Sequence, residues 1–259
     1  MMSTVKEKVI KAPAAISITG LSKSFNNSSF YVLEEVDLSI QRGEFFILLG
    51  PSGCGKSTLL NIIAGFIDKS AGELIVDEEE VHKPGRNRGV VFQQADSALF
   101  PWLTVKENIE FGLKMKNVSK NIRQETSSYY INLVGLKGHE GKFPRELSGG
   151  MKQRVQLARV LANDPEILLM DEPFGALDAM TRRTMQTELV RIWKETNKTV
   201  IFVTHDIQEA LLLGQKVGVM SVGPSSNIET IYDIPLPYPR SFTDKEFSLF
   251  YHSIQSHFD

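Results

Sequence analysis

Eight consecutive residues in the first quarter of the chain have the composition of a phosphate-binding loop. They are Gly50-Pro51-Ser52-Gly53-Cys54-Gly55-Lys56-Ser57, and Thr58 follows them. This spacing matches the P-loop pattern in full. Glycines let backbone N–H groups turn toward phosphate oxygens, and the N-terminus of the next helix adds its positive end. We therefore expect nucleotide binding here, with Lys56 on the β- and γ-phosphates and Ser57 on Mg²⁺.

The thiol of Cys54 inside this loop has two possible roles. The positive end of a helix lowers the pKa of a nearby thiol and makes it reactive. Phosphate binding in the loop uses the backbone, however, so Cys54 can also be a small residue without chemistry, and we favour this second interpretation. Cys54 is the only cysteine of the sequence. The chain therefore contains no internal disulfide and fits a reducing compartment.

Two adjacent carboxylates end an apolar run later in the chain. The run Ile167-Leu168-Leu169-Met170 is followed by Asp171-Glu172-Pro173. An Asp-Glu pair at a strand end can be ordinary surface charge, but its combination with a P-loop favours catalysis. Asp171 is then placed to support the Mg²⁺ shell. Glu172 is placed to polarise the attacking water as general base.

A third run, Leu147-Ser148-Gly149-Gly150-Met151, continues with Lys152-Gln153-Arg154. Ser148 suits the N-cap of a helix. Gly149 and Gly150 leave backbone N–H groups bare at the helix start, which makes a second anion site. The plain alternative is a capped helix that begins with a glycine turn. One P-loop and one detached anion site in a chain suggest a composite pocket.

This third run resembles the signature of ABC ATPases, and other motifs of that family follow in the expected order. They are Gln93 after Val90-Val91-Phe92, the run Gly175-Ala176-Leu177-Asp178, and Val203-Thr204-His205-Asp206. The resemblance implies that Gln93 contacts Mg²⁺ and senses the γ-phosphate, with Gln94 as the alternative in register. It also implies that Asp178 lies at a subunit contact and that His205 bonds the γ-phosphate. The resemblance covers about residues 16–231.

The same resemblance implies ATP and Mg²⁺ as cofactors and a second ATPase subunit as partner. In the family, two subunits pair head to tail, and the signature of one closes on the ATP of the other. Phe25, in Leu21-Ser22-Lys23-Ser24-Phe25, is similar to the aromatic residue that stacks on adenine. A core aromatic is the alternative, because such rings serve both roles. With Glu172 and the signature intact, a homodimer has two working sites, whereas a heterodimer with a degenerate partner has one.

The elements between the motifs predict an α/β fold. Continuous apolar runs suit strands buried on both faces of a mostly parallel sheet. These runs are 45–49, 89–92, 167–170, 199–203 and 217–220, and helical patterns lie at 56–64, 151–162 and 180–195. Alternation in 16–21 and 31–40 predicts two antiparallel strands joined by a turn at Asn26-Asn27-Ser28-Ser29. The resulting fold class is a P-loop NTPase, with a RecA-like sheet, an antiparallel β subdomain and a helical insertion.

The helical insertion is expected at about residues 95–163, where helical patterns at 104–115 and 120–134 occur without a buried-strand pattern. We expect one ABC ATPase domain over residues 14–240. A flexible arm over residues 1–13 precedes it, and a short tail over residues 241–259 follows.

The chain lacks the uninterrupted apolar runs that membrane insertion needs. No run reaches the ~18–20 residues that span a bilayer, and the N-terminus lacks the pattern of a secretion signal. Formal net charge is −2, which gives no global attraction to nucleic acid. A role at a membrane would therefore need a partner, and the resemblance implies a peripheral protein on the cytoplasmic face of the inner membrane, held there by integral membrane permease subunits.

Three stretches resemble importers of the nitrate, sulfonate, taurine and bicarbonate group. They are residues 91–108, residues 170–178 and the proline-rich run at 234–240. This likeness implies an extracytoplasmic solute-binding partner, although the ATPase subunit normally makes no contact with the solute. Phe100 and Trp102 either line the groove for a membrane-subunit helix or pack inside the insertion. The alternatives are an exporter subunit, a soluble ABC ATPase acting on DNA or the ribosome, and an inactive binding module.

Overall fold

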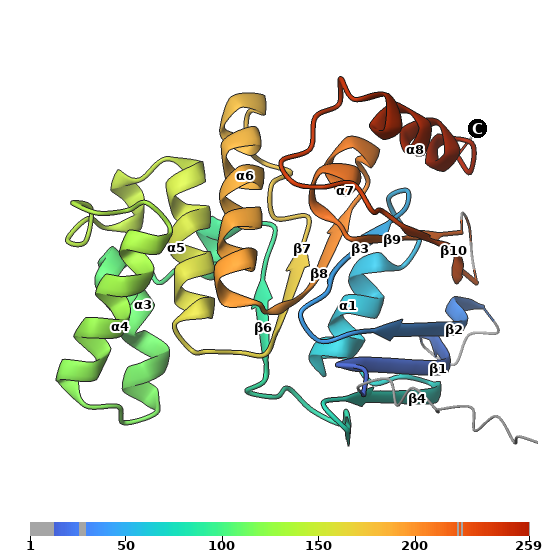
Figure 1. The fold of residues 1–259 in the computed structure, drawn as a ribbon. Coiled ribbons are helices and arrows are strands. Elements are labelled where there is room, and N and C mark those ends of the chain that lie inside the picture. Colours follow the sequence, from blue (N-terminus) through green and yellow to red (C-terminus); the bar gives the residue numbers. More distant parts are fainter. Residues whose placement is uncertain (1–12, 26–29, 222, 224, 259) are drawn as a thin grey trace, which may run out of the picture.

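The computed structural model describes residues 13–25, 30–221, 223 and 225–258. Two sheets and the helices around them make up this part of the chain (Figure 1). The larger sheet has the order β10-β9-β3-β8-β7-β6, in which only β10 runs antiparallel to its neighbour. Its strands are β3 (Phe45–Leu49), β6 (Arg88–Val91), β7 (Ile167–Asp171), β8 (Thr199–Thr204), β9 (Lys216–Met220) and β10 (Ile228–Asp233).

The smaller sheet is antiparallel and has the order β2-β1-β4-β5. Its strands are β1 (Ile16–Ser24), β2 (Tyr31–Ile40), β4 (Ala71–Val76) and β5 (Glu79–Glu80). Helix α1 (Lys56–Ala64) connects the sheets physically, since its buried side chains share one core with strands of both. Alternate side chains of β3 divide between two cores, because successive residues of a strand point to opposite faces. Phe46 and Leu48 face α1, whereas Phe45 and Ile47 face the other helices.

The helical insertion forms one side of the molecule (Figure 1). It consists of α2 (Ala95–Ala98), α3 (Val105–Met115), α4 (Lys120–Leu133), the 3-10 turn η1 (Pro144–Glu146) and α5 (Gly149–Leu161). Within this described stretch no strand occurs, as the sequence patterns predict. Helix α3 begins with a capping box, in which Thr104 accepts from the Glu107 N–H and Glu107 accepts from the Thr104 N–H.

The remaining helices are α6 (Ala179–Thr196), α7 (Ile207–Leu213) and α8 (Lys245–Gln255). Helix α8 lies within the expected tail and packs against α7, with Phe247 and Ile254 buried. No helix of the described residues is long and apolar enough to cross a membrane.

The structure differs from the sequence expectations at several elements. Strand β6 was expected to be buried on both faces, but it is the edge strand of its sheet and three of its four residues are only half-buried. The two predicted antiparallel strands do pair as β1 and β2, whereas β4 and β5 of the same sheet and β10 of the larger sheet were not expected. The predicted turn at 26–29 and the predicted arm, apart from Pro13, lie outside the described residues.

Candidate nucleotide-binding site

The parallel strands bring several predicted site residues to one edge of the larger sheet. Leu49 pairs with Thr204, and Asp171 pairs with Val203, so β3, β8 and β7 end at the same level. Strand β8 lies between the other two. Residues that follow these strands therefore meet at the carboxyl edge, where ligands bind in open α/β sheets.

The P-loop has the backbone geometry of a phosphate cradle. Gly53 and Gly55 have φ angles of 86° and 94°, a region that residues with a Cβ rarely adopt. A Cβ on Gly55 would lie 2.8 Å from Leu33 Cδ2, so β2 packs directly against the loop. Helix α1 starts at Lys56 without a side-chain cap, which leaves the N–H groups of its first turn available for an anion. Thr58 is half-buried in that first turn, while Ser52 is exposed and Pro51 is half-buried.

Lys56 is held inside the loop rather than extended into solvent. Its side chain is buried, and Nζ donates to the carbonyl oxygens of Gly50 at 2.8 Å and Pro51 at 2.7 Å. The neighbouring Cys54 is also buried, and its Sγ lies 4.0 Å from Lys56 Nζ. Burial raises the pKa of the Cys54 thiol, although the charge of Lys56 opposes this. The geometry therefore favours the interpretation of Cys54 as a packing residue.

Ser57 and Asp171 are in contact although 114 residues separate them in sequence. Ser57 Oγ donates to Asp171 Oδ1 at 2.9 Å. Burial raises the pKa of the Asp171 carboxyl, and the hydrogen bond from Ser57 acts in the opposite direction. A hydroxyl and a carboxylate offer the hard oxygen ligands that Mg²⁺ prefers. Mg²⁺ usually takes only a few of its ligands from the protein. The residues present therefore fit a magnesium ion shared with phosphate oxygens.

Glu172 and His205 form the second contact at this edge. His205 Nδ1 lies 3.1 Å from Glu172 Oε2, across the ends of β8 and β7. Glu172 has a φ of 40°, an uncommon conformation for a residue with a side chain. Its N–H donates to Val203 O at 3.1 Å, which holds the unusual turn in place. Strained backbone of this kind gathers at functional sites because the surroundings must impose it.

Gln93 approaches the same pair of residues from the end of β6. A Cβ built on Gly175 would lie 3.3 Å from Gln93 Nε2 and 4.0 Å from Glu172 Oε2. Both side chains thus come close to this glycine, and Gln93 itself is exposed. The structure therefore gathers Gln93, Glu172 and His205 near one another, and it separately pairs Ser57 with Asp171.

The signature residues lie elsewhere. In Figure 1 the start of α5 and the P-loop are separated by α6, β7 and β8. Ser148 caps α5 by accepting from the Met151 N–H at 3.4 Å. A Cβ on Gly150 would lie 2.5 Å from Thr181 Cγ2, so this glycine allows α5 to pack against the start of α6. Gly149 is exposed.

Asp178 and Phe25 are also outside the group at the sheet edge. Asp178 caps α6, accepting from the N–H groups of Met180 at 3.1 Å and Thr181 at 3.0 Å. Its contacts with Thr181 hold the pKa of the carboxyl below its usual range. Phe25 is 42% exposed, with Lys23 Nζ 4.8 Å from its ring centroid. It is therefore not a core aromatic, and one ring face can be offered to a ligand.

A buried hydrogen-bond network behind His205 was missed by the sequence reasoning. Thr204 Oγ1 donates to Glu209 Oε2 at 2.6 Å, and Gln186 Nε2 donates to Glu209 Oε1 at 3.0 Å. Thr204 also accepts from the Asp206 N–H at 3.1 Å. All of Thr204, Gln186 and Glu209 are buried. Three polar residues from separate elements leave no local sequence signal.

Comparisons with known proteins identify the family of the chain. A family model described as ABC transporter matches residues 33–175. The taurine import ATP-binding protein of Roseobacter denitrificans is 48% identical over 223 residues, covering 85% of this chain and 82% of that protein. The aliphatic sulfonates import ATP-binding protein of Bacillus cereus is 46% identical over 234 residues, covering 90% and 91%.

Solved structures show the same fold. The chain matches cbiO1 of Clostridium perfringens, part of the ABC transporter complex cbiONQ, with a TM-score of 0.79 and 27% identity, covering 86% of this chain and 89% of that chain. It matches the ATP-binding cassette MJ0796, determined as a dimer bound to ADP and Pi, with a TM-score of 0.73 and 32% identity, covering 86% and 100%. The predicted α/β P-loop fold and the predicted family are thus confirmed, and the chain belongs to the ABC transporter family as an ATP-binding subunit that hydrolyses ATP.

Proposed function

We propose that the chain energises the import of a small solute, such as taurine, an aliphatic sulfonate or a related anion. The observation that carries this proposal is the likeness, at 46–48% identity over most of the chain, to two proteins named for such import. The chain would act as a peripheral subunit on the cytoplasmic face of the inner membrane. Its partners would be permease subunits, a second ATPase subunit and an extracytoplasmic solute-binding protein.

Each site residue then has a role that its position supports. ATP, when bound, would supply the γ-phosphoryl group, which is transferred to water as ADP leaves, and Mg²⁺ would neutralise charge on the phosphates. Lys56 and the N–H groups of the loop would bind phosphate oxygens, while Ser57, Asp171 and Gln93 would hold the metal. Glu172 accepts a proton from the attacking water, and His205 at 3.1 Å orients this carboxylate and contacts the γ-phosphate. Phe25 stacks on adenine.

The separation of the signature from the P-loop supports a dimer with shared sites. One copy would contribute its P-loop and sheet edge, and its partner would contribute Ser148, Gly149 and Gly150 at the start of α5. Asp178 would stand at the contact between the copies. Two ATP molecules would hold the copies together until hydrolysis releases them, which is a rigid-body switch between two arrangements.

The dimer is tested with Glu172→Gln, which keeps the shape of the site and removes the general base. We expect retained ATP binding, loss of nearly all turnover, and a stable dimer with ATP and Mg²⁺, measured by size-exclusion chromatography with light scattering. Glu166→Gln is a matched control, because Glu166 is exposed just before the opposite end of β7. A Glu172→Gln chain that stays monomeric with ATP and Mg²⁺ would contradict the shared-site model.

The permease contact is best supported at Trp102. Phe100 packs inside the insertion, with its ring centroid 4.4 Å from Phe111 and 4.8 Å from the Arg159 guanidinium carbon. Trp102 is 70% exposed. The buried side chain of Asn108 holds the loop that carries Trp102. Its amide oxygen accepts from the Phe100 N–H, and its amide nitrogen donates to the Phe100 carbonyl oxygen. A rigidly held, exposed tryptophan is a typical anchor of protein interfaces.

Affinity purification from detergent-solubilised native membranes tests this contact and the import proposal together. Recovery of a multi-span membrane protein and a solute-binding protein is the expected result. Trp102→Ala should reduce the recovery while ATP binding stays unchanged. Leu249→Ala serves as control, since Leu249 is 64% exposed on α8, away from the insertion. Recovery of soluble partners alone would refute the transport assignment and leave the ATPase assignment intact.

A further inference from the structure

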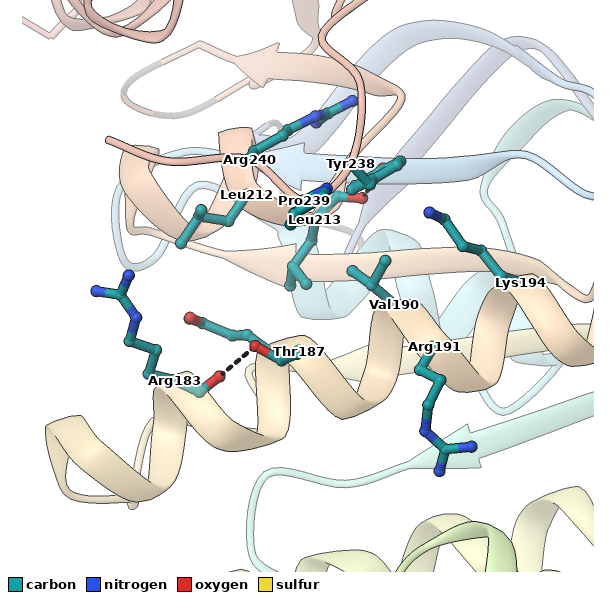
Figure 2. A pocket seen from close by; sticks show the side chains of 11 residues that line it. Arg183, Thr187, Val190, Arg191, Lys194, Leu212, Leu213, Tyr238, Pro239 and Arg240 are labelled. Carbon is teal, nitrogen blue, oxygen red and sulfur yellow. Dashed lines mark hydrogen bonds between the residues drawn. The ribbon is translucent and has the colours of Figure 1, made fainter. Parts of the chain in front are cut away.

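A cavity of about 410 Å³ lies between α6, α7 and the segment that leads to α8. Its lining contains four cationic side chains and no carboxylate. The whole chain, in contrast, has slightly more acidic than basic residues. Val190, Leu212 and Leu213 form an apolar part of the wall, as Figure 2 shows. Such a volume and mixed lining are typical of small-molecule sites.

The cations of this cavity differ in how their charge is balanced. Arg191 points away from Tyr238 and Leu213 in Figure 2, and it pairs with Glu188 at 2.9 Å and Glu195 at 2.7 Å. For Arg183, Lys194 and Arg240, in contrast, no carboxylate partner exists among the described residues. The cavity is therefore more positive than its surroundings.

Arg240 is the most unusual of these residues, because it is only 9% exposed. Its guanidinium donates to the carbonyl oxygens of Leu236, Leu211, Gly214 and Ile234 at 2.5–3.0 Å. These acceptors take up four of its five N–H donors, and no carboxylate of the described residues neutralises its charge, which is costly in a buried place. Burial accordingly lowers the pKa of Arg240.

The ring of Tyr238 contacts two of these cations. Arg240 lies 4.2 Å and Lys194 4.8 Å from the centroid of the same Tyr238 ring. Lys194 and Val190 follow each other at helical spacing along α6, so they share the face that looks toward Leu213. An anion beside Tyr238 would thus have an apolar surface next to it.

We propose that this cavity binds a small organic anion, with its charged group near Lys194 and Arg240 and its apolar body against Val190, Leu212 and Leu213. The proposal is independent of the transported solute and of the nucleotide site. A molecule with a single anionic group and about six carbons could place its charge near the cations and its carbon chain along the apolar wall. A ligand of that size would bind with a Kd on the order of 1 mM.

Hexane-1-sulfonate is a suitable probe. Its binding is measured by methyl NMR of the full chain, which is first saturated with MgADP so that the nucleotide site is filled. We expect saturable shifts at the methyl groups of Val190, Leu212 and Leu213, and none at Leu59 in α1. Hexan-1-ol should bind at least about threefold more weakly, and hexyltrimethylammonium should not bind, because charge selects the ligand. Binding should also weaken as the salt concentration rises.

Two variants of exposed α6 residues test where the anionic group of the bound probe lies. Lys194→Gln should raise the Kd about threefold. Arg191→Gln removes the same charge from the same helix, but its guanidinium is already paired, so the Kd should change by less than about 1.5-fold. The proposal is overturned by an absence of shifts up to about tenfold the expected Kd, by equal shifts with the cationic probe, or by equal effects of the two variants.

Discussion

The carboxylate of Glu209 offers a sharp test of how the sheet edge is held in place. It accepts hydrogen bonds from Thr204 on β8 and Gln186 on α6, and it is buried. Glu209→Ala removes both acceptors at once. The Gln186 amide and the Thr204 hydroxyl are then left as buried donors, each costing about 1–3 kcal/mol when unsatisfied. Thr204 keeps its bond from the Asp206 N–H, so the lower half of this range applies to it.

We therefore expect Glu209→Ala to lower the free energy of unfolding by about 2–4 kcal/mol. Glu209→Gln should lower it by only about 1–2 kcal/mol, since its amide oxygen can still accept from Gln186 and only the Thr204 hydroxyl loses its acceptor. Urea denaturation followed by circular dichroism measures both values. An alanine variant within about 0.5 kcal/mol of the parent chain would refute the reasoning.

The free energy of unfolding should also depend on pH through the Glu209 carboxyl. Burial raises the pKa of Glu209, against the opposing hydrogen bonds from Thr204 and Gln186. The folded chain therefore binds this proton more tightly than the unfolded chain does. Its contribution to stability is fully present below the unfolded pKa and is lost as pH rises through the folded pKa. As pH rises from the unfolded pKa through the raised folded pKa, the glutamine variant should gain stability relative to the parent chain, and a difference that stays flat would contradict this assignment.

Three further predictions concern the P-loop and the signature helix. Lys56→Ala should weaken ATP binding by at least about tenfold, because a desolvated cation on the phosphates is lost; unchanged affinity in a fluorescent-nucleotide titration would remove the basis of the P-loop assignment. Cys54 should react slowly with iodoacetamide in the folded chain, because it is 3% exposed and burial raises its pKa, and fast labelling at a rate close to that of the unfolded chain would show a reactive thiol. Gly150→Ala should destabilise the chain by about 1–3 kcal/mol, since the new Cβ would lie 2.5 Å from Thr181 Cγ2. Thr181→Ala should restore most of that loss, because only the 4.0 Å contact with Thr181 Cβ remains; a double variant no more stable than Gly150→Ala would place the strain elsewhere.

Elements with a strong local pattern could be predicted from the sequence. Helix α1 has the predicted bounds, because the P-loop fixes its start and Gly65 in the left-handed conformation ends it. Strands β3 and β8 are fully buried and appear as continuous apolar runs. Strand β10 alternates between half-buried and exposed residues, and β5 has only two residues, so neither forms such a run. Helix α8 does carry Phe247, Phe250 and Ile254 at helical spacing, a signal that the tail assignment overlooked.

The candidate site could be predicted as separate residues but not as contacts. Asp171, Glu172 and His205 were expected at strand ends, and the strand order β3-β8-β7 then places them at one edge of the sheet. The bond from Ser57 to Asp171 requires this order, since it joins distant segments. The network of Glu209 depends on the packing of α6 against α7 and the sheet. Packing between elements involves side chains whose local sequence looks like that of any amphipathic helix.

Helix α6 connects the signature helix α5 with the residues behind the sheet edge, which are the two halves of the site in the proposed dimer. Its first turn packs on Gly150 of the signature helix through Thr181, and five residues later Gln186 bonds Glu209 behind His205. A displacement of α5 by a partner's nucleotide would therefore act on α6, and α6 cannot move far without straining the Glu209 network. Rigid helices with buried polar contacts transmit displacement because their packing changes in discrete steps. If this holds, Glu209→Ala should lower the turnover of ATP more than it lowers ATP affinity. Equal losses of both would mean that the network serves stability alone.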